Sequence, residues 1–310
     1  MNLVTVFGGS GFLGRYVVRQ LASKGYFVRV IARKPNEALF LKVYGKVGQI
    51  QLLRGDIKNE KNLRDYVKGS DCVINCVATF FETHSQSFKN LHVDAARNLA
   101  KAATKEKVNQ FIHISSLGAF SNSSSQLLKS KGAGEDAVLN NFSNANIIRP
   151  SLIFGSEDTF FNRFAKLSLI SPFIPVVGPS TQFQPVYVDD VAKAVSLLVE
   201  TDQKRRYLEL GGDEIYTFKE LIGMLLYEIK RKRIILKIPF LVAKVLSSTN
   251  DFLRLISGGL VPPFLTLAQV KSLESDNLVG SNAEKFSDIG IVPKKLSMIL
   301  PKIVARFNRS

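Results

Sequence analysis

The chain has 310 residues, 45% of them apolar, which is enough to fill a large core and excludes a disordered, fibrous or small disulfide-stapled protein. Lys and Arg exceed Asp and Glu by 16, so we expect an anionic partner: a phosphorylated cofactor, an anionic lipid, an acidic protein or nucleic acid. The chain has two cysteines, no basic and apolar leader at its start, and no apolar run near the roughly 20 residues of a membrane span, so we expect a cytoplasmic protein.

The first half alternates between short β-rich runs and helical patterns. We predict strands at Leu3–Phe7, Val28–Ala32, Gln51–Leu53, Cys72–Val77, Phe111–Ser115 and Ala145–Ile148. We predict helices at Leu13–Lys24, Lys61–Val67, Asn90–Thr104 and Ser130–Leu139. Strands separated by helices of this length favour right-handed crossovers, which predicts an α/β fold with a Rossmann-type, doubly wound parallel sheet.

The alternation weakens after Gly155, where phenylalanines and prolines accumulate. A strand-like run at Phe183–Val188 precedes a helix with Asp189 at its N-cap, and Tyr207–Leu210 is predicted as another strand. The sequence beyond is mainly helical.

Near the C-terminus, Thr266 and Gln269 match a capping box, which predicts a folded helix start rather than a disordered tail. We therefore expect a smaller, mostly helical C-terminal lobe beside the sheet. We assign 1–155 and 182–215 to the Rossmann domain, and 156–181 and 216–310 to the lobe.

A glycine-rich turn follows the first predicted strand and opens the first predicted helix. Glycine permits positive φ and lets backbone N–H groups approach a pyrophosphate at a helix N-terminus, where the helix dipole favours an anion. Four glycines in this context predict dinucleotide binding, whereas a merely tight turn would not need four. The residues of the turn are Gly8, Gly9, Ser10, Gly11, Phe12, Leu13 and Gly14.

The second predicted strand ends in cations where NAD-binding folds place a carboxylate for the ribose 2′-hydroxyl. Here Ala32 is followed by Arg33 and Lys34. A guanidinium can form two hydrogen bonds with a 2′-phosphate, so we expect Arg33 to favour NADP(H) over NAD(H). The alternative is that Arg33 is only a solvated strand end, and the nearby Glu37 keeps that reading open.

Several motifs resemble the extended and atypical branch of the short-chain dehydrogenases/reductases. Besides the glycine turn, they are Gly55-Asp56-Ile57, Phe111-Ile-His-Ile-Ser115-Ser116, Arg149-Pro150-Ser151-Leu152-Ile153-Phe154-Gly155 and Pro185-Val-Tyr-Val-Asp189-Asp190-Val-Ala192. The resemblance implies a catalytic-type serine at Ser116. It implies cofactor contacts from Asp56, Ile57, Ala78, Ser115, Lys131 and Pro150.

The tail is similar to that of one atypical group in this branch. The similar residues are Leu265-Thr266-x-x-Gln269-Val270-x-x-Leu273-x-x-Asp276-Asn277, Gly290-Ile-x-Pro293 and Ile299-Leu-Pro301. That group contains the NADPH-binding accessory subunit of respiratory NADH:ubiquinone oxidoreductase (complex I) and its bacterial relatives. The resemblance implies NADPH and complex I subunits as partners.

The family's catalytic tyrosine is missing. Carbonyl reduction in this family uses a tyrosine four residues before a lysine, and the phenol donates the proton. Here the lysine is Lys131, the tyrosine position is Leu127, and no tyrosine lies between Tyr66 and Tyr187. General acid catalysis contributes roughly 10²–10⁴-fold, so we expect the family chemistry to be slow or absent. Lys131 would keep a role in ribose binding, and the alternative for Ser116 is a hydroxyl bonded to nearby backbone.

No metal site is expected. Cys72 and Cys76 lack a further thiol or imidazole at ligand spacing, and His84, His92 and His113 show no ligand pattern. Packing or surface roles explain all five side chains.

A basic cluster, Lys230-Arg231-Lys232-Arg233, is followed by apolar residues and Lys237. It suits an anionic membrane surface or an acidic protein, and a solvated charged edge is the equal alternative.

The leading hypothesis is therefore a non-catalytic or weakly catalytic NADP(H)-binding accessory subunit of complex I, cytoplasmic and peripheral on the cytoplasmic face of the inner membrane. The alternative is a free NADP-dependent oxidoreductase or epimerase acting on a carbonyl or sugar-nucleotide substrate. Nucleic acid is disfavoured as a partner because no interleaved aromatic and basic recognition motif is present.

Overall fold

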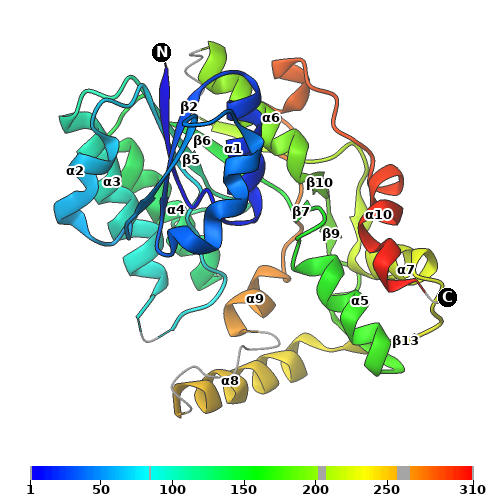
Figure 1. The fold of residues 1–310 in the computed structure, drawn as a ribbon. Helices are drawn as coiled ribbons and strands as arrows, with labels where there is room; N and C mark the ends of the chain where they lie inside the picture. The colour runs from blue at the N-terminus through cyan, green and yellow to red at the C-terminus, as the bar shows by residue number, and fades with distance from the viewer. Residues whose placement is uncertain (1, 84, 202–206, 257–265, 309–310) are drawn as a thin grey trace.

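A seven-stranded sheet, parallel throughout, forms the centre of the computed structural model, which describes residues 2–83, 85–201, 207–256 and 266–308 (Figure 1). The strand order is β11-β6-β5-β4-β1-β2-β3. The strands are β1 (Leu3–Phe7), β2 (Phe27–Ala32), β3 (Ile50–Arg54), β4 (Cys72–Asn75), β5 (Gln110–Ile114), β6 (Asn146–Pro150) and β11 (Tyr207–Leu210). The first six follow the order of the dinucleotide-binding fold, with the switch point between β1 and β4, so the predicted Rossmann-type sheet is confirmed.

Helices cover both faces of the sheet (Figure 1). On one face α1 (Phe12–Ser23) packs against α6 (Val188–Thr201), and on the other lie α2 (Glu60–Val67), α3 (Ala95–Lys105) and α4 (Gln126–Leu139). A π-helical turn at Lys89–Asp94 leads into α3, and 3₁₀-helical turns at Pro35–Tyr44 follow β2. The sequence pattern predicted neither of these irregular segments.

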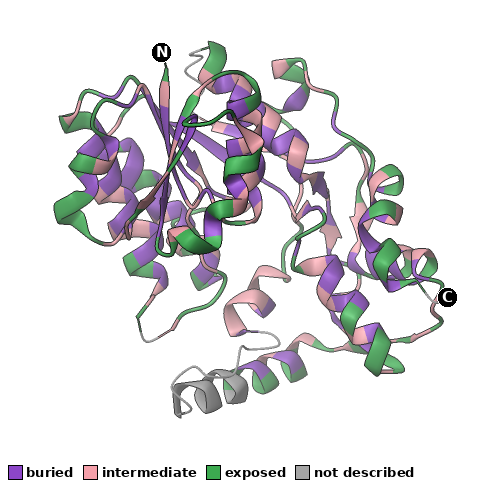
Figure 2. Ribbon diagram, viewed as in Figure 1, coloured by how far each residue is buried: buried purple, intermediate pink, exposed green. Residues whose placement is uncertain are grey.

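The sheet is buried on both faces because its strands are almost continuously apolar, as a parallel sheet between helix layers requires (Figure 2). Val4 and Val6 face the core shared with α1 and α6, whereas Phe7 and Val73 face the core shared with α2 and α3. The two cores hold the carboxyl ends of the strands in fixed positions at one edge.

The second half of the chain supplies short strand pairs and further helices. The strands are β7 (Ile153–Phe154), β8 (Phe173–Val177), β9 (Gln182–Phe183), β10 (Val186–Tyr187), β12 (Tyr216–Thr217) and β13 (Ile234–Ile238). The helices are α5 (Phe160–Ile170), α7 (Phe218–Glu228), α8 (Phe240–Ile256), α9 (Leu267–Ser272) and α10 (Leu296–Val304). A separate apolar core joins α5, α7 and α10. The predicted capping box of Thr266 and Gln269 is confirmed at the start of α9.

The predicted strand Phe183–Val188 was wrong as a single element. Pro185 has no N–H for a sheet ladder and divides the run into β9 and β10, which pair with different strands. Helix α6 already begins at Val188, so the prediction of Asp189 as an N-cap was also wrong. The Asp189 carboxylate instead accepts hydrogen bonds from Arg19 and Gln20 on α1.

The division into a Rossmann domain and a lobe stays a prediction. Part of the predicted lobe packs against the sheet. Phe286 lies in the core under α1 and α6, and the Glu209 N–H of β11 donates to the Glu284 carbonyl. Within the described ranges, no helix combines the length and apolarity needed to cross a membrane.

Candidate dinucleotide site

The glycine turn connects β1 to α1 at the carboxyl edge of the sheet. Gly8 has a φ of +76°, and a Cβ on it would lie 3.0 Å from the carbonyl carbon of Cys76. The Gly11 N–H closes the turn on the Gly8 carbonyl at 3.0 Å. No described side chain caps α1, which begins at Phe12, so its first turn offers backbone N–H groups to an anion.

Two glycines of the turn are required by packing. A Cβ on Gly14 would lie 2.1 Å from the Gly8 carbonyl oxygen, so α1 can approach the turn only because residue 14 has no side chain. A Cβ on Gly9 would lie 2.8 Å from Val30 on β2. Gly11 is exposed, and its added Cβ would meet only the Gly8 carbonyl oxygen, at 3.1 Å.

Arg33 follows β2 directly and is exposed at the same edge. The neighbouring carboxylate of Glu37 pairs with Lys34 at 2.7 Å, and no described residue forms an ion pair with Arg33. Asp56 and Ile57 follow β3: Ile57 is buried, and the Asp56 carboxylate accepts the Lys58 N–H at 2.9 Å.

The remaining predicted residues lie at the carboxyl ends of the next strands. Ala78 is exposed beyond β4, Ser115 and Ser116 follow β5, and Pro150 is the last residue of β6. Because the strands are parallel, all these ends meet at one edge, where ligands of doubly wound folds bind. The structure thus places the predicted residues along one edge, while their roles remain expectations.

Lys131 is a buried cation in the middle of this edge. Its side chain comes from α4, its ammonium donates to the Ser115 carbonyl at 3.3 Å, and it lies 5.6 Å from the centre of the Phe80 ring. Burial lowers the pKa of Lys131 to about 8, although Glu135 opposes the shift. At neutral pH the group therefore remains largely charged and available to an oxygen of a ligand.

His92 contacts α4 at Ser130, the residue directly before Lys131. The Thr79 N–H donates to its Nε2 at 3.1 Å, so the neutral ring carries its proton on Nδ1 and donates it to Ser130 Oγ at 2.8 Å. Ser130 in turn donates to the Leu127 carbonyl. Burial, followed by repulsion from Lys131, lowers the pKa of His92 to about 3, so the imidazole is a neutral structural group. The expectation of a packing role fits this geometry.

Leu127 is buried on α4, one turn before Lys131. The nearest tyrosines in the sequence bond elsewhere or lie on other elements: the Tyr66 hydroxyl donates to the Arg54 carbonyl, and Tyr187 belongs to β10. Ser116 Oγ is buried and has no hydrogen-bond partner among the described residues. The alternative reading of Ser116, a hydroxyl bonded to nearby backbone, is therefore not seen among the described residues.

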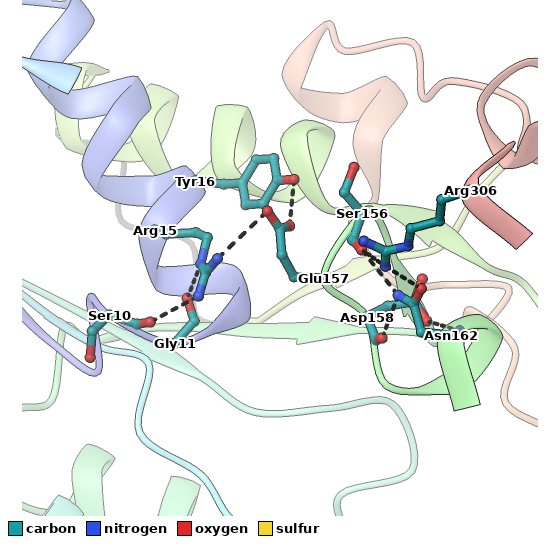
Figure 3. A network of polar contacts seen from close by, with 9 residues as sticks. All are labelled: Ser10, Gly11, Arg15, Tyr16, Ser156, Glu157, Asp158, Asn162 and Arg306. Atoms are coloured by element: carbon teal, nitrogen blue, oxygen red, sulfur yellow. Dashed lines mark hydrogen bonds and ion pairs between the residues drawn. The ribbon is translucent and has the colours of Figure 1, made fainter. Parts of the chain in front are cut away.

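Arg15 is a residue of the turn that the sequence analysis missed. Its guanidinium donates to the carbonyls of Ser10 and Gly11 and lies 3.5 Å from Glu157 (Figure 3). Glu157 also accepts the Tyr16 hydroxyl at 2.8 Å. The signal was a charged residue directly after the last glycine of the turn, in a helix whose next residues are apolar.

These residues fit a dinucleotide. The turn is tight because residues 8 and 14 have no Cβ to collide with backbone, and it leaves the start of α1 without a side-chain cap. The buried cation Lys131 and the exposed cation Arg33 lie on the two sides of the turn. The arrangement can bind phosphates and ribose, but Leu127 provides no proton donor. Among the described residues, no cluster of His, Cys, Asp and Glu side chains could hold a metal ion, and His84 lies outside those residues.

Comparison with known proteins gives a family match over much of the chain. The model of the NAD dependent epimerase/dehydratase family matches residues 4–211. The NADH dehydrogenase (ubiquinone) 1 alpha subcomplex subunit 9 of Arabidopsis thaliana mitochondria is 35% identical over 301 residues, covering 95% of this chain and 75% of the relative. The mitochondrial NADH-ubiquinone oxidoreductase 40 kDa subunit of Neurospora crassa is 30% identical over 297 residues, covering 96% and 77%.

Solved structures share the fold. The NADPH-dependent quinone oxidoreductase of Escherichia coli, complexed with NADPH, superposes with a TM-score of 0.75 at 17% identity, covering 98% of this chain and 100% of that chain. A complex of MoeE5 with UDP-glucose and NAD has a TM-score of 0.72 at 18% identity and covers 98% of both chains.

Proposed function

This chain belongs to the NAD dependent epimerase/dehydratase family, and we propose that it is an NADP(H)-binding accessory subunit of respiratory NADH:ubiquinone oxidoreductase that holds its nucleotide without turning it over. The observation that carries the proposal is a complete glycine turn on the same edge as Lys131, with Leu127, a side chain that has no proton to donate, one turn before Lys131 on α4. Family membership confirms the resemblance noted in the sequence. The two relatives described above, which match almost the whole chain, are subunits of the respiratory enzyme.

Within this proposal the nucleotide has a structural role. A ligand that binds only the folded state stabilises it by RT ln(1 + [L]/Kd), so tight binding strengthens the fold without any reaction. A bound NADPH supplies a hydride donor, but the chain places no phenol at the donor position beside it. Lys131 would hold the nicotinamide ribose, the turn the pyrophosphate, and Arg33 the 2′-phosphate.

Preference for NADP(H) rests on Arg33. A carboxylate at this position would repel a 2′-phosphate, whereas the nearby acid, Glu37, is held by Lys34. Arg33 is exposed and has no ion-pair partner among the described residues, so binding a phosphate would break no existing ion pair within that part of the chain.

The proposal is tested on protein purified from the organism that encodes it. Native mass spectrometry should find the chain with one NADP(H), and an affinity tag on the chain should recover NADH:ubiquinone oxidoreductase subunits from detergent-solubilised membranes. A chain that carries no dinucleotide would contradict the binding role. A tagged chain that recovers no subunit of the respiratory enzyme would contradict the partner.

We further propose a peripheral contact with an anionic membrane surface through residues 229–248. This stretch holds six Lys and Arg and no Asp or Glu. Lys230, Lys232 and Lys237 are exposed. On α8, Leu241 and Val245 are 76% and 60% exposed, one turn apart on the same helix face. Apolar side chains flanked by cations are typical of interfacial helices on anionic lipid.

Vesicle sedimentation tests this contact. The protein should sediment with vesicles containing phosphatidylglycerol and much less with pure phosphatidylcholine. Leu241→Ser combined with Val245→Ser should reduce binding to the vesicles. The matched control is Val43→Ser, which replaces an exposed apolar residue in the 3₁₀-helical segment after β2 and should not reduce binding. Equal sedimentation of the α8 variant and the wild type would contradict the proposal, as would equal binding to both kinds of vesicle.

One observation favours the alternative, a free NADP-dependent oxidoreductase or epimerase. Ser116 Oγ is buried without a partner among the described residues, and an unsatisfied buried hydroxyl is costly unless it has a use. A substrate carbonyl would satisfy it. Turnover measurements on the purified protein separate the two functions.

A further inference from the structure

The Arg15 guanidinium lies over the glycine turn. Side chains in a helix lean toward its N-terminus, so an arginine at the fourth position of α1 covers residues one turn earlier. Its Nε lies 3.3 Å from the Gly11 carbonyl oxygen, and one terminal nitrogen lies 3.3 Å from the Ser10 carbonyl oxygen. On the β2 side, the guanidinium lies 4.7 Å from the centre of the Phe40 ring, in the segment that follows Arg33.

Arg15 is loosely held in this position. Its hydrogen bonds to the two carbonyls are 3.3 Å long, and its distance to Glu157 is 3.5 Å, whereas charge-assisted hydrogen bonds are usually about 2.7–2.9 Å. Arg19, one turn further along α1, shows the difference: it donates to Asp189 at 2.8 Å. The Arg15 side chain is only one quarter exposed, so a cation is kept beside the turn without a close anionic partner among the described residues.

Glu157 does not depend on Arg15 for its position. The Tyr16 hydroxyl donates to its second carboxylate oxygen at 2.8 Å, and burial together with this carboxylate raises the pKa of Tyr16 (Figure 3). Arg15 can therefore change partners while Glu157 stays bonded to α1. Ion pairs between partly exposed groups contribute little, so leaving this one costs little.

We propose that Arg15 holds a phosphate group of the bound dinucleotide and that Glu157 is the anion it exchanges for that phosphate. This inference rests on the proposed nucleotide-binding function. The phosphate is either the pyrophosphate at the start of α1 or the 2′-phosphate beside β2, since Arg15 borders both the turn and the segment that follows β2. In either position a guanidinium gives two directed hydrogen bonds to phosphate oxygens.

Titration calorimetry with NADPH and with NADH tests the role of Arg15. Arg15→Gln should weaken NADPH binding roughly 10- to 100-fold, the effect of losing hydrogen bonds to a charged group. Equal weakening of NADH would identify the pyrophosphate, and unchanged NADH binding would identify the 2′-phosphate. Arg15→Lys should recover part of the loss because it keeps the charge. The matched control is Arg19→Gln on the same helix, which should bind both nucleotides like the wild type.

Glu157→Gln tests the exchange. Its amide oxygen can still accept the Tyr16 hydroxyl, but the negative charge near the phosphate is gone, so NADPH should bind roughly two- to five-fold more tightly. In the Arg15→Gln background the same change should have a smaller effect. Weaker NADPH binding by Glu157→Gln would overturn the exchange, because Glu157 would then be positioning Arg15.

The failures are distinguishable. If the wild-type chain binds neither nucleotide, the proposed function fails. If the wild type binds NADPH and Arg15→Gln binds it equally well, with an unchanged circular dichroism spectrum, only the role of Arg15 is overturned.

Discussion

The Lys131 ammonium donates to the Ser115 carbonyl oxygen at 3.3 Å, which fixes a buried cation of α4 against the end of β5. Replacing it should separate ligand binding from folding. Lys131→Met should weaken NADPH binding roughly 10- to 100-fold because a charged donor is lost. It should not lower the melting temperature, because the substitution removes a desolvated charge. Lys129→Met, on an exposed position of the same helix, is the control for calorimetry and melting. Undiminished NADPH affinity in Lys131→Met would remove Lys131 from the site.

Arg33→Ala should weaken NADPH and leave NADH unchanged. The two nucleotides differ only in the 2′-phosphate, so NADH is the internal control for any general disturbance of the site. We expect roughly a 10- to 100-fold loss for NADPH, measured by titration calorimetry at fixed salt. Equal affinities of the wild type for NADH and NADPH would contradict the assigned preference.

Gly14 and Gly11 should respond differently to the same substitution. A Cβ on Gly14 would collide with the Gly8 carbonyl at 2.1 Å, so Gly14→Ala should lower the melting temperature and nucleotide affinity together. Gly11→Ala should lower the melting temperature much less than Gly14→Ala, because its Cβ meets a single atom, at 3.1 Å. It should still bind NADPH more weakly, since backbone must approach phosphate there. Thermal melting and calorimetry on both variants provide the comparison. A stable Gly14→Ala variant would show that α1 is not held against the turn.

Purified protein with NADPH should show no appreciable hydride transfer to carbonyl or quinone acceptors. Leu127→Tyr should not create activity, because a donor that was not positioned with a reacting carbonyl gains little. The rate of NADPH oxidation is measured in a steady-state assay that follows the absorbance of NADPH over time. Brisk oxidation with a defined substrate, lost in Ser116→Ala, would instead establish an enzyme.

The sheet could be predicted from sequence because its signals are local. Apolar runs such as Leu3–Phe7 alternate with helical patterns, and the glycine turn marks the first crossover. The irregular segments could not be predicted, because they depend on contacts between residues far apart in the sequence. The π-helical turn at Lys89–Asp94 lies where the His92 carbonyl approaches Gly134 so closely that a Cβ there would be 2.2 Å away. The hydrophobic periodicity around His92 or around Gly134 does not indicate that these two residues are in contact.

The residues of the candidate site that belong to local sequence motifs could be predicted. The positions of Gly8 and Lys131 follow from spacing on one strand, turn or helix. The pairing of Arg15 with Glu157 could not be predicted, because the two residues are far apart in the sequence and only the packing of α1 beside the loop after β7 brings them together. The same holds for Ser116, whose isolation depends on the groups that surround it.

Two buried imidazoles should make the protein sensitive to mild acid. Burial, with repulsion from Lys131, lowers the pKa of His92 to about 3 and that of His113 to about 4. An unfolded chain takes up protons on these rings near pH 6.5, so the unfolded state binds more protons and stability falls as the pH drops from about 6.5 toward 4.

Asp158 acts in the opposite direction over part of this range. Burial raises the pKa of its carboxyl to about 6, so the folded state holds a proton that the unfolded state releases down to about pH 4. Acidification from pH 7 to 5 therefore recovers roughly 1 kcal/mol at Asp158, while each imidazole costs about 2 kcal/mol by pH 5. The two imidazoles outweigh Asp158, so these three groups together should lower the free energy of unfolding by roughly 2–3 kcal/mol between pH 7 and pH 5.

Urea denaturation of the wild type and of His92→Gln at pH 7 and pH 5 measures how much of the loss in the free energy of unfolding is due to His92. The glutamine side chain cannot take up a proton, so the variant should lose about 2 kcal/mol less than the wild type on acidification, whatever its stability at pH 7. Comparing the change with pH, rather than the stability itself, cancels the cost of replacing the acceptor of the Thr79 N–H. His113→Gln should reduce the loss similarly, and the double variant should become slightly more stable at pH 5 than at pH 7, because only Asp158 would then titrate among the three. Parallel losses in the wild type and the double variant would show that other groups govern the acid response.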